Sequence, residues 1–147
     1  MRIREILRKK GSDVVTIEPS ASVQDAIQAL VDHNIGGLVV TASNGSVVGI
    51  ITERDILRES AERSDRLKET KVADVMTKDV LIGVPDDDLN YVMGVMTKNR
   101  IRHLPVLDES GLVGIVSIGD VVNSHLSQTE FENRMLKDYI HGVNATP

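Results

Sequence analysis

The sequence has no cysteine and no tryptophan, and its aromatic side chains are one phenylalanine and two tyrosines. The absence of cysteine excludes disulfide frameworks, thiolate nucleophiles and cysteine-based zinc sites. With so few aromatic rings the core must be aliphatic, and base-stacking platforms for single-stranded nucleic acid are not expected. The net charge of −5 also argues against a nucleic-acid partner, because such binding rests on lysine and arginine neutralising phosphates.

Long uncharged runs are missing as well. The amino terminus is charged from Arg2 onward and carries no apolar run of signal-peptide length. No segment approaches the roughly 20 apolar residues that a helix needs to span a bilayer. We therefore expect a cytoplasmic protein without a membrane partner. A chain of 147 residues is long enough to bury a core without covalent staples.

The sequence does contain one pattern twice. Residues 13–40 align without a gap with residues 79–106, at an offset of 66. When Ser46 is skipped, residues 47–55 align with residues 112–120 at an offset of 65. Self-similarity over this length indicates two copies of one structural unit.

Both copies predict the same order of elements. A similar lead-in, residues 3–7 or 72–76, comes first, and a β-rich run that ends at a proline follows. Next come a helix with apolar residues at i, i+3, i+4 and i+7, a hairpin with a tight turn, and a second helix. The predicted strands are residues 14–17, 38–41 and 47–51, and residues 80–84, 104–107 and 112–116. The second helices are expected to begin near Asp55 and Asp120.

One such unit is too small to bury its sheet alone, so the two should pack together. We therefore predict an α/β fold of two pseudo-symmetric βαββα repeats packed sheet to sheet. The predicted segments are repeat 1 at 1–60, a polar connector at 61–71, repeat 2 at 72–126 and a helical tail at 127–147. The apolar residues of the tail fit either a helix that covers its own domain or a dimer contact, since amphipathicity does not name the partner.

The two copies also share a short motif. It runs Gly49 to Asp55 and Gly114 to Asp120, each with a glycine, two apolar residues, a hydroxyl residue, two variable residues and an aspartate. This motif resembles the nucleotide signature of CBS domains, and Arg102-His103-Leu104-Pro105-Val106 resembles another segment of that family. The likeness covers residues 1 to about 126.

The resemblance implies a regulatory module, a stand-alone pair of CBS repeats that binds an adenosine ligand in a cleft between them. Members of this family bind AMP, ATP, NAD or S-adenosylmethionine and often form flat homodimers that signal to another protein. We accordingly expect a homodimer and a regulated protein whose identity is unknown.

The motif residues suit an adenosine nucleotide chemically. An ionised aspartate can accept hydrogen bonds from both ribose hydroxyls, and a hydroxyl near a helix N-terminus can donate to a phosphate. By the resemblance, each cleft takes its aspartate from one repeat and its first strand from the other. The primary cleft would comprise Thr16, Gly36, Gly37, Arg54, Arg102, His103, Ser117 and Asp120. The secondary cleft would comprise Thr52, Asp55, Leu81, Ile82 and Gly83, with Arg102 or His103 at its rim.

The Asp120 cleft ranks first because Ile82 replaces the hydroxyl that Thr16 supplies in the other copy. One or two basic residues per cleft favour AMP or NAD(H) over ATP, whose extra charge needs more cations.

Structural alternatives exist for each of these residues. The hydroxyl and aspartate pairs could serve only as helix caps, Gly36-Gly37 could only end a helix, and residues 86–88 place acidic side chains in a first helical turn rather than at a metal. No nucleophile elbow, P-loop or zinc motif occurs, and His33, His103, His125 and His141 lack metal-ligand spacing. We expect no catalytic residue and no metal. A structural module without a ligand and a small hydrolase are the alternative functions.

Overall fold

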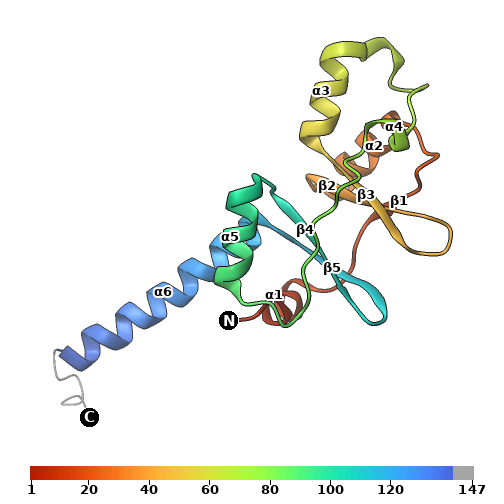
Figure 1. Ribbon diagram of the computed structural model, residues 1–147. Helices are drawn as coiled ribbons and strands as arrows, with labels where there is room; N and C mark the ends of the chain where they lie inside the picture. Colours follow the sequence, from red (N-terminus) through yellow and green to blue (C-terminus); the bar gives the residue numbers. More distant parts are fainter. Residues whose placement is uncertain (141–147) are drawn as a thin grey trace.

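The computed structural model describes residues 1–140, and Figure 1 shows them as two lobes joined by extended segments. The first lobe holds β1 (Thr16–Ile17), α2 (Val23–His33), β2 (Gly37–Thr41), β3 (Val47–Thr52), α3 (Glu53–Arg63), the 3-10 helix η1 (Ser64–Arg66) and α4 (Val72–Val75). The second holds α1 (Ile3–Lys10), α5 (Leu89–Asn99), β4 (His103–Asp108), β5 (Gly111–Ser117) and α6 (Ile118–Ile140). Residues 141–147, which include His141 and the end of the predicted tail, lie outside the described residues.

Helix α2 shows how the first repeat is built. Ser22 and Asp25 form the predicted capping box, in which the Asp25 N–H donates to Ser22 Oγ at 3.0 Å. The helix ends at Asn34, whose left-handed backbone suits asparagine. The apolar face of α2 packs against β2 and β3 in one cluster, which includes Val23, Ala26, Leu30, Leu38, Val40 and Ile51.

The second repeat follows the same plan with its own core. Helix α5 begins at the predicted N-cap Asp88, whose carboxylate accepts from the Asn90 N–H at 2.9 Å. It ends at Arg100, again in the left-handed region. The buried cluster includes Ile3, Ile6, Leu89, Val92, Met96, Leu104, Val106 and Val116. The α/β class and the two pseudo-symmetric repeats predicted from the sequence are confirmed.

The two lead-in helices are exchanged between the repeats. Helix α1 precedes the first repeat in sequence but packs on β5 of the second, whereas α4 packs in the core of the first. The motif glycines make this exchange feasible. A Cβ on Gly49 would lie 2.5 Å from Met76 Sδ, and one on Gly114 would lie 2.6 Å from Leu7 Cδ2. Each glycine therefore leaves room for a side chain of a lead-in segment.

The first strands are shorter than predicted. In the first repeat only Thr16–Ile17 pairs with β2, in parallel, and Thr16 lies opposite Val39. In the second repeat the predicted strand 80–84 is reduced to a single bridge between Gly83 and Val106. The position equivalent to Val39 is Pro105, which has no N–H to extend the ladder. The prediction of a full strand at 80–84 was wrong for this reason.

The faces of the sheets that point away from these cores are covered too. Val39 alternates with Leu38 and Val40 along β2, so that its side chain lies on the other face, yet it is fully buried. Pro105, its counterpart on β4, is also buried. Burial of both faces is what sheet-to-sheet packing of the repeats produces.

Helix α6 extends away from the second lobe into the predicted tail (Figure 1). Near the start of α6, Val121 is buried, whereas further along Phe131 is 65% exposed and Tyr139 is 86% exposed. The described part of the tail, residues 127–140, therefore does not cover its own domain. Within residues 1–140, no helix combines the length and the apolar composition needed to cross a membrane.

Candidate functional site: a basic cleft between the repeats

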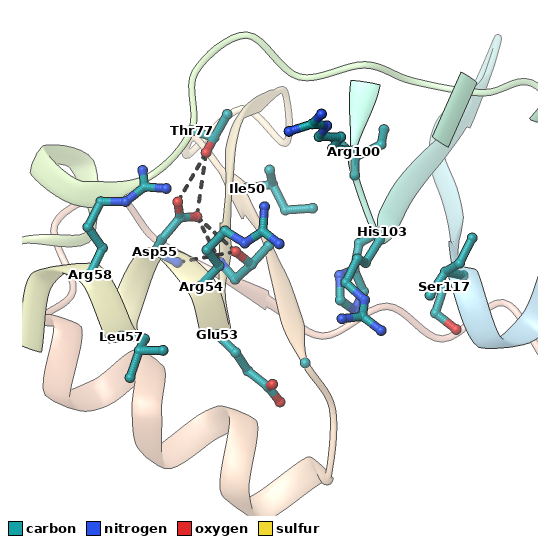
Figure 2. Close-up of a pocket in the computed structure, with 15 residues that line it drawn as sticks. Ile50, Glu53, Arg54, Asp55, Leu57, Arg58, Thr77, Arg100, His103 and Ser117 are labelled. Carbon is teal, nitrogen blue, oxygen red and sulfur yellow. Dashed lines mark hydrogen bonds between the residues drawn. The ribbon is translucent and has the colours of Figure 1, made fainter. Parts of the chain in front are cut away.

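A cleft of about 610 Å³ lies between the two repeats. One wall comes from the end of β3, the start of α3 and the linker residue Thr77; the other comes from the segment between α5 and β4 and from the end of β5 (Figure 2). Its lining residues are Gly36, Ile50, Thr52, Glu53, Arg54, Asp55, Leu57, Arg58, Thr77, Arg100, Ile101, Arg102, His103, Ser117 and Ile118.

Thr52 and Asp55 are held in place by the start of helix α3. Thr52 is the N-cap, so the helix begins at Glu53, two residues earlier than predicted. The Asp55 Oδ2 atom accepts from the Thr52 N–H at 3.0 Å, while the Asp55 N–H donates to Thr52 Oγ1 at 3.4 Å. The capping alternative is therefore observed. It leaves Asp55 Oδ1 facing Thr77 Oγ1, which donates at 3.3 Å (Figure 2).

The opposite wall carries a cation in an unusual backbone conformation. Arg100 has a φ of 54°, a left-handed conformation that costs a non-glycine residue about 1 kcal/mol. Its equivalent in the first repeat is Asn34, which adopts this region more readily. The side chains of Arg100 and His103 lie across the cleft from Asp55 (Figure 2).

His103, which belongs to the second repeat, contacts the first repeat. Its ring packs against the backbone at the start of β2, since a Cβ on Gly37 would lie 3.1 Å from His103 Cγ and one on Gly36 would lie 3.3 Å from His103 Nε2. Because α2 already ends at Asn34, these glycines are not the helix stop; they make room for the imidazole. Burial lowers the pKa of His103, although the Glu53 carboxylate opposes this shift. The ring is therefore neutral at pH 7.

The charge of the cleft is positive. Four arginines, at positions 54, 58, 100 and 102, and two carboxylates, those of Glu53 and Asp55, line it, which leaves an excess of two positive charges. The isoleucines 50, 101 and 118 add an apolar surface. Such a combination can hold an anionic group at one end and a flat apolar group at the other.

The predicted site residues divide between this cleft and other places. Members of both predicted clefts line it together, namely Gly36, Thr52, Arg54, Asp55, Arg102, His103 and Ser117. The remaining predicted residues, Thr16, Gly37, Leu81, Ile82, Gly83 and Asp120, are not among the lining residues. Asp55 therefore lines the cleft between the repeats, and Asp120 does not.

Asp120 has a different environment. It lines a separate cleft of about 300 Å³ together with Lys10, whose Nζ lies 2.6 Å from Asp120 Oδ2. The same carboxylate oxygen accepts from the Ser117 N–H at 2.8 Å. Burial would raise the pKa of Asp120, but the hydrogen bonds from Lys10 and Ser117 outweigh it and lower the pKa overall. Asp120 is therefore a charged, paired carboxylate.

The polar residues that sequence reasoning missed at these sites include Lys10, Glu53, Arg58, Thr77 and Arg100. Arg58 could have been found, because it lies one helical turn after Arg54 on the same helix face. Thr77 and Lys10 reach their aspartates only through the exchanged lead-ins, which no local pattern encodes.

The acidic run 86–88 is fully engaged in structural roles. Asp86 bonds to Arg4, Asp87 accepts from the Val84 N–H at 2.9 Å, and Asp88 caps α5. Among residues 1–140, no group of three or more potential metal ligands converges.

Two pseudo-symmetric α/β repeats with exchanged lead-ins, and a cleft between a threonine–aspartate pair and a basic strand end, define a CBS domain pair. A family model of the CBS domain matches residues 3–62 and again residues 72–126, and the chain belongs to this family. A CBS pair is a regulatory module.

Relatives and solved structures agree with this assignment. The mitochondrial CBS domain-containing protein CBSX3 of Arabidopsis thaliana is 36% identical over 148 residues, covering 95% of this chain and 72% of the relative. A crystal structure of a CBS-domain containing protein from Agrobacterium tumefaciens matches with a TM-score of 0.82 at 38% identity. The match covers 85% of this chain and 99% of the Agrobacterium chain.

Two further relatives bear on function. The CBS domain pair of protein MJ0100 was solved in complex with 5'-methylthioadenosine and S-adenosyl-L-methionine; it has a TM-score of 0.78 at 27% identity and covers 87% of this chain and 98% of its own. An inosine-5'-monophosphate dehydrogenase of Nitrosopumilus maritimus is 37% identical over 127 residues, 82% of this chain but only 25% of the enzyme's length.

Proposed function

We propose that this CBS pair binds an adenosine nucleotide in the cleft at Asp55 and passes its occupancy on to a partner protein. The observation that carries the proposal is the arrangement of Asp55 on one wall and of Arg100 and Arg102 on the other. That a related CBS pair holds two adenosine compounds supports the same class of ligand.

The cleft supplies each contact that such a ligand needs. The Asp55 Oδ1 atom faces the cleft next to Thr77 and can accept from a ribose hydroxyl. The guanidinium groups of Arg54, Arg58, Arg100 and Arg102 can donate to phosphate oxygens. Ile50 and Ile101 offer an apolar surface for the adenine ring.

Charge selects among the adenosine ligands. The excess of two positive charges matches the roughly two negative charges of AMP or of a dinucleotide pyrophosphate. We therefore place AMP and NAD(H) first and ATP next. S-adenosylmethionine carries a positive sulfonium, which the four arginines disfavour.

Calorimetric titration with AMP tests the proposal, and NAD, ATP and S-adenosylmethionine provide the selectivity series. Asp55→Asn keeps an oxygen for the helix cap but removes the charge, so AMP affinity should fall about 10-fold or more, as expected for the loss of a charge-assisted hydrogen bond. Asp25→Asn is the matched control, because Ser22 and Asp25 form the same capping box away from the cleft.

The control variant should bind AMP like the unchanged protein. Equal losses in both variants would show that Asp55 acts only as a cap, and the lack of saturable binding to any of the four compounds would remove the nucleotide proposal. Because a regulatory module needs no turnover, AMP and ATP should be recovered intact after prolonged incubation. Hydrolysis would favour the alternative of a small hydrolase.

We also propose a homodimer. Apolar side chains remain exposed along α6, including Phe131, Met135, Leu136 and Tyr139, and a second copy of the chain would remove them from water. Light scattering of the purified protein measures this directly, with a dimer mass expected and a monomer mass contradicting the proposal.

A further inference from the structure

The two aspartates of the duplicated motif are held by different partners. In the first repeat, Thr77 bonds to β3 and to the motif aspartate. Its N–H donates to the Ile50 carbonyl at 2.8 Å and its hydroxyl donates to Asp55. In the second repeat, Lys10 takes both roles. Its Nζ donates to the Ile115 carbonyl at 2.8 Å and to Asp120 at 2.6 Å.

Ile50 and Ile115 are equivalent positions of the repeat, as are Asp55 and Asp120. A neutral hydroxyl at 3.3 Å from one aspartate is thus replaced by an ammonium group at 2.6 Å from the other.

The difference arises from the lengths of the lead-in helices. Helix α4 ends at Val75, and the chain then turns to place Thr77 beside β3. Helix α1 continues for an additional turn to Lys10 and ends at Gly11, which has a φ of 97°. Its last turn is basic, with Arg8, Lys9 and Lys10, and cations are favoured at a helix C-terminus. The extra turn carries Lys10 across the edge of β5.

The environment of the ion pair between Lys10 and Asp120 favours its stability. The side chain of Lys10 is 35% exposed and that of Asp120 is 25% exposed, so both are partly shielded from water. The lowered pKa of Asp120 keeps its carboxylate charged at neutral pH. The lysine ammonium can donate three hydrogen bonds, of which Asp120 and Ile115 accept two.

We propose that Lys10 is a tethered counterion that closes the Asp120 site, so that each chain binds one adenosine nucleotide and not two. A ribose that approached Asp120 would have to displace an ammonium group already bonded to its carboxylate. Among residues 1–140, no cationic side chain forms an ion pair with Asp55, so its site stays open. Lys10 thereby determines which of the two pseudo-equivalent sites is used. The inference rests on the proposed function in one respect, that the motif aspartate receives the ribose.

Lys10→Met tests this, because methionine keeps the length and the apolar stem of the side chain and removes the charge. Calorimetric titration with AMP should give one site per chain for the unchanged protein and two for Lys10→Met. Lys9→Met is the matched control: Lys9 lines the same small cleft, and no hydrogen bond or ion pair joins its side chain to another residue of 1–140. The control should remain at one site.

A second background separates this proposal from the proposed function. The double variant Asp55→Asn/Lys10→Met should bind one AMP per chain. Adding Asp120→Asn to this double variant should abolish AMP binding. If the unchanged protein binds no AMP but Lys10→Met binds one, the Asp55 proposal fails and the Lys10 proposal stands. Lys10→Met that binds no more AMP than the unchanged protein overturns the Lys10 proposal, as does Lys10→Met with weaker binding, which would make Lys10 a phosphate ligand.

Discussion

Replacing Arg100 by glycine should stabilise the protein and weaken its nucleotide binding at the same time. The left-handed backbone at Arg100 costs a non-glycine residue about 1 kcal/mol, which glycine relieves. Loss of the positive charge at the C-terminus of α5 lowers the free energy of unfolding by about 0.3 kcal/mol. The free energy of unfolding should therefore rise by about 0.7 kcal/mol, which for a chain of this size raises Tm by about 2 °C.

The same substitution removes one of the four guanidinium groups that line the cleft. A hydrogen bond to a charged group contributes about 1.5 kcal/mol at the low end of its range, which suits a cleft open to water. AMP affinity should fall about 10-fold. Calorimetric scanning without ligand measures the first effect, and titration with AMP measures the second.

Asn34→Gly is the matched control, since Asn34 has the same left-handed conformation at the end of α2 and does not line the cleft. It should leave AMP affinity unchanged and alter Tm less, because asparagine already tolerates this backbone. A lower Tm in Arg100→Gly would refute the strain argument. Unchanged AMP affinity would show that Arg100 does not contact the ligand.

Two further predictions concern stability. Gly49→Ala should destabilise the protein by about 1–3 kcal/mol, because its Cβ would overlap Met76, whereas Gly94→Ala, with open space in the middle of α5, should stabilise it by about 0.5–1 kcal/mol; urea denaturation measures both, and equal effects would contradict the packing argument. The pKa of His103 is lowered by burial, so the folded state binds fewer protons than the unfolded state, and stability should be full above pH 6.5 and decline as the pH falls below it. In the His103→Gln variant, thermal unfolding measured against pH should lack the loss of stability that His103 causes. An unchanged pH profile would show that His103 does not cause this loss.

The repeat pattern was sufficient to predict most of the fold. The offset of 66 residues located both helices with i, i+3, i+4 and i+7 spacing, and Ser22, Asp25 and Asp88 marked their caps. The prediction failed at residues 80–84, although the cause is visible in the sequence. Pro105 stands where Val39 stands in the other copy, and a proline cannot continue the ladder.

The candidate site was less predictable, because it depends on long-range placement. Asp55 and Thr77 are 22 residues apart, and Lys10 and Asp120 are 110 residues apart. Both contacts require that each lead-in packs on one particular repeat. The ranking of Asp120 above Asp55 was based on Thr16 and Ile82, neither of which lines the cleft between the repeats.

The asymmetry at the starts of β2 and β4 could have been interpreted from the sequence. Gly36-Gly37 and Arg102-His103 occupy equivalent positions of the repeat, and in the structure His103 packs directly against the two glycines. Two bulky residues cannot meet at such a contact, so bulk on one strand requires glycine on the other.

A crystal structure of the protein grown with AMP tests the central claim most directly. The account predicts the ribose within hydrogen-bond distance of the Asp55 carboxylate, the phosphate on the guanidinium groups of Arg100 and Arg102, and Lys10 still bonded to Asp120. AMP bound at Asp120 with the Asp55 cleft empty would contradict it.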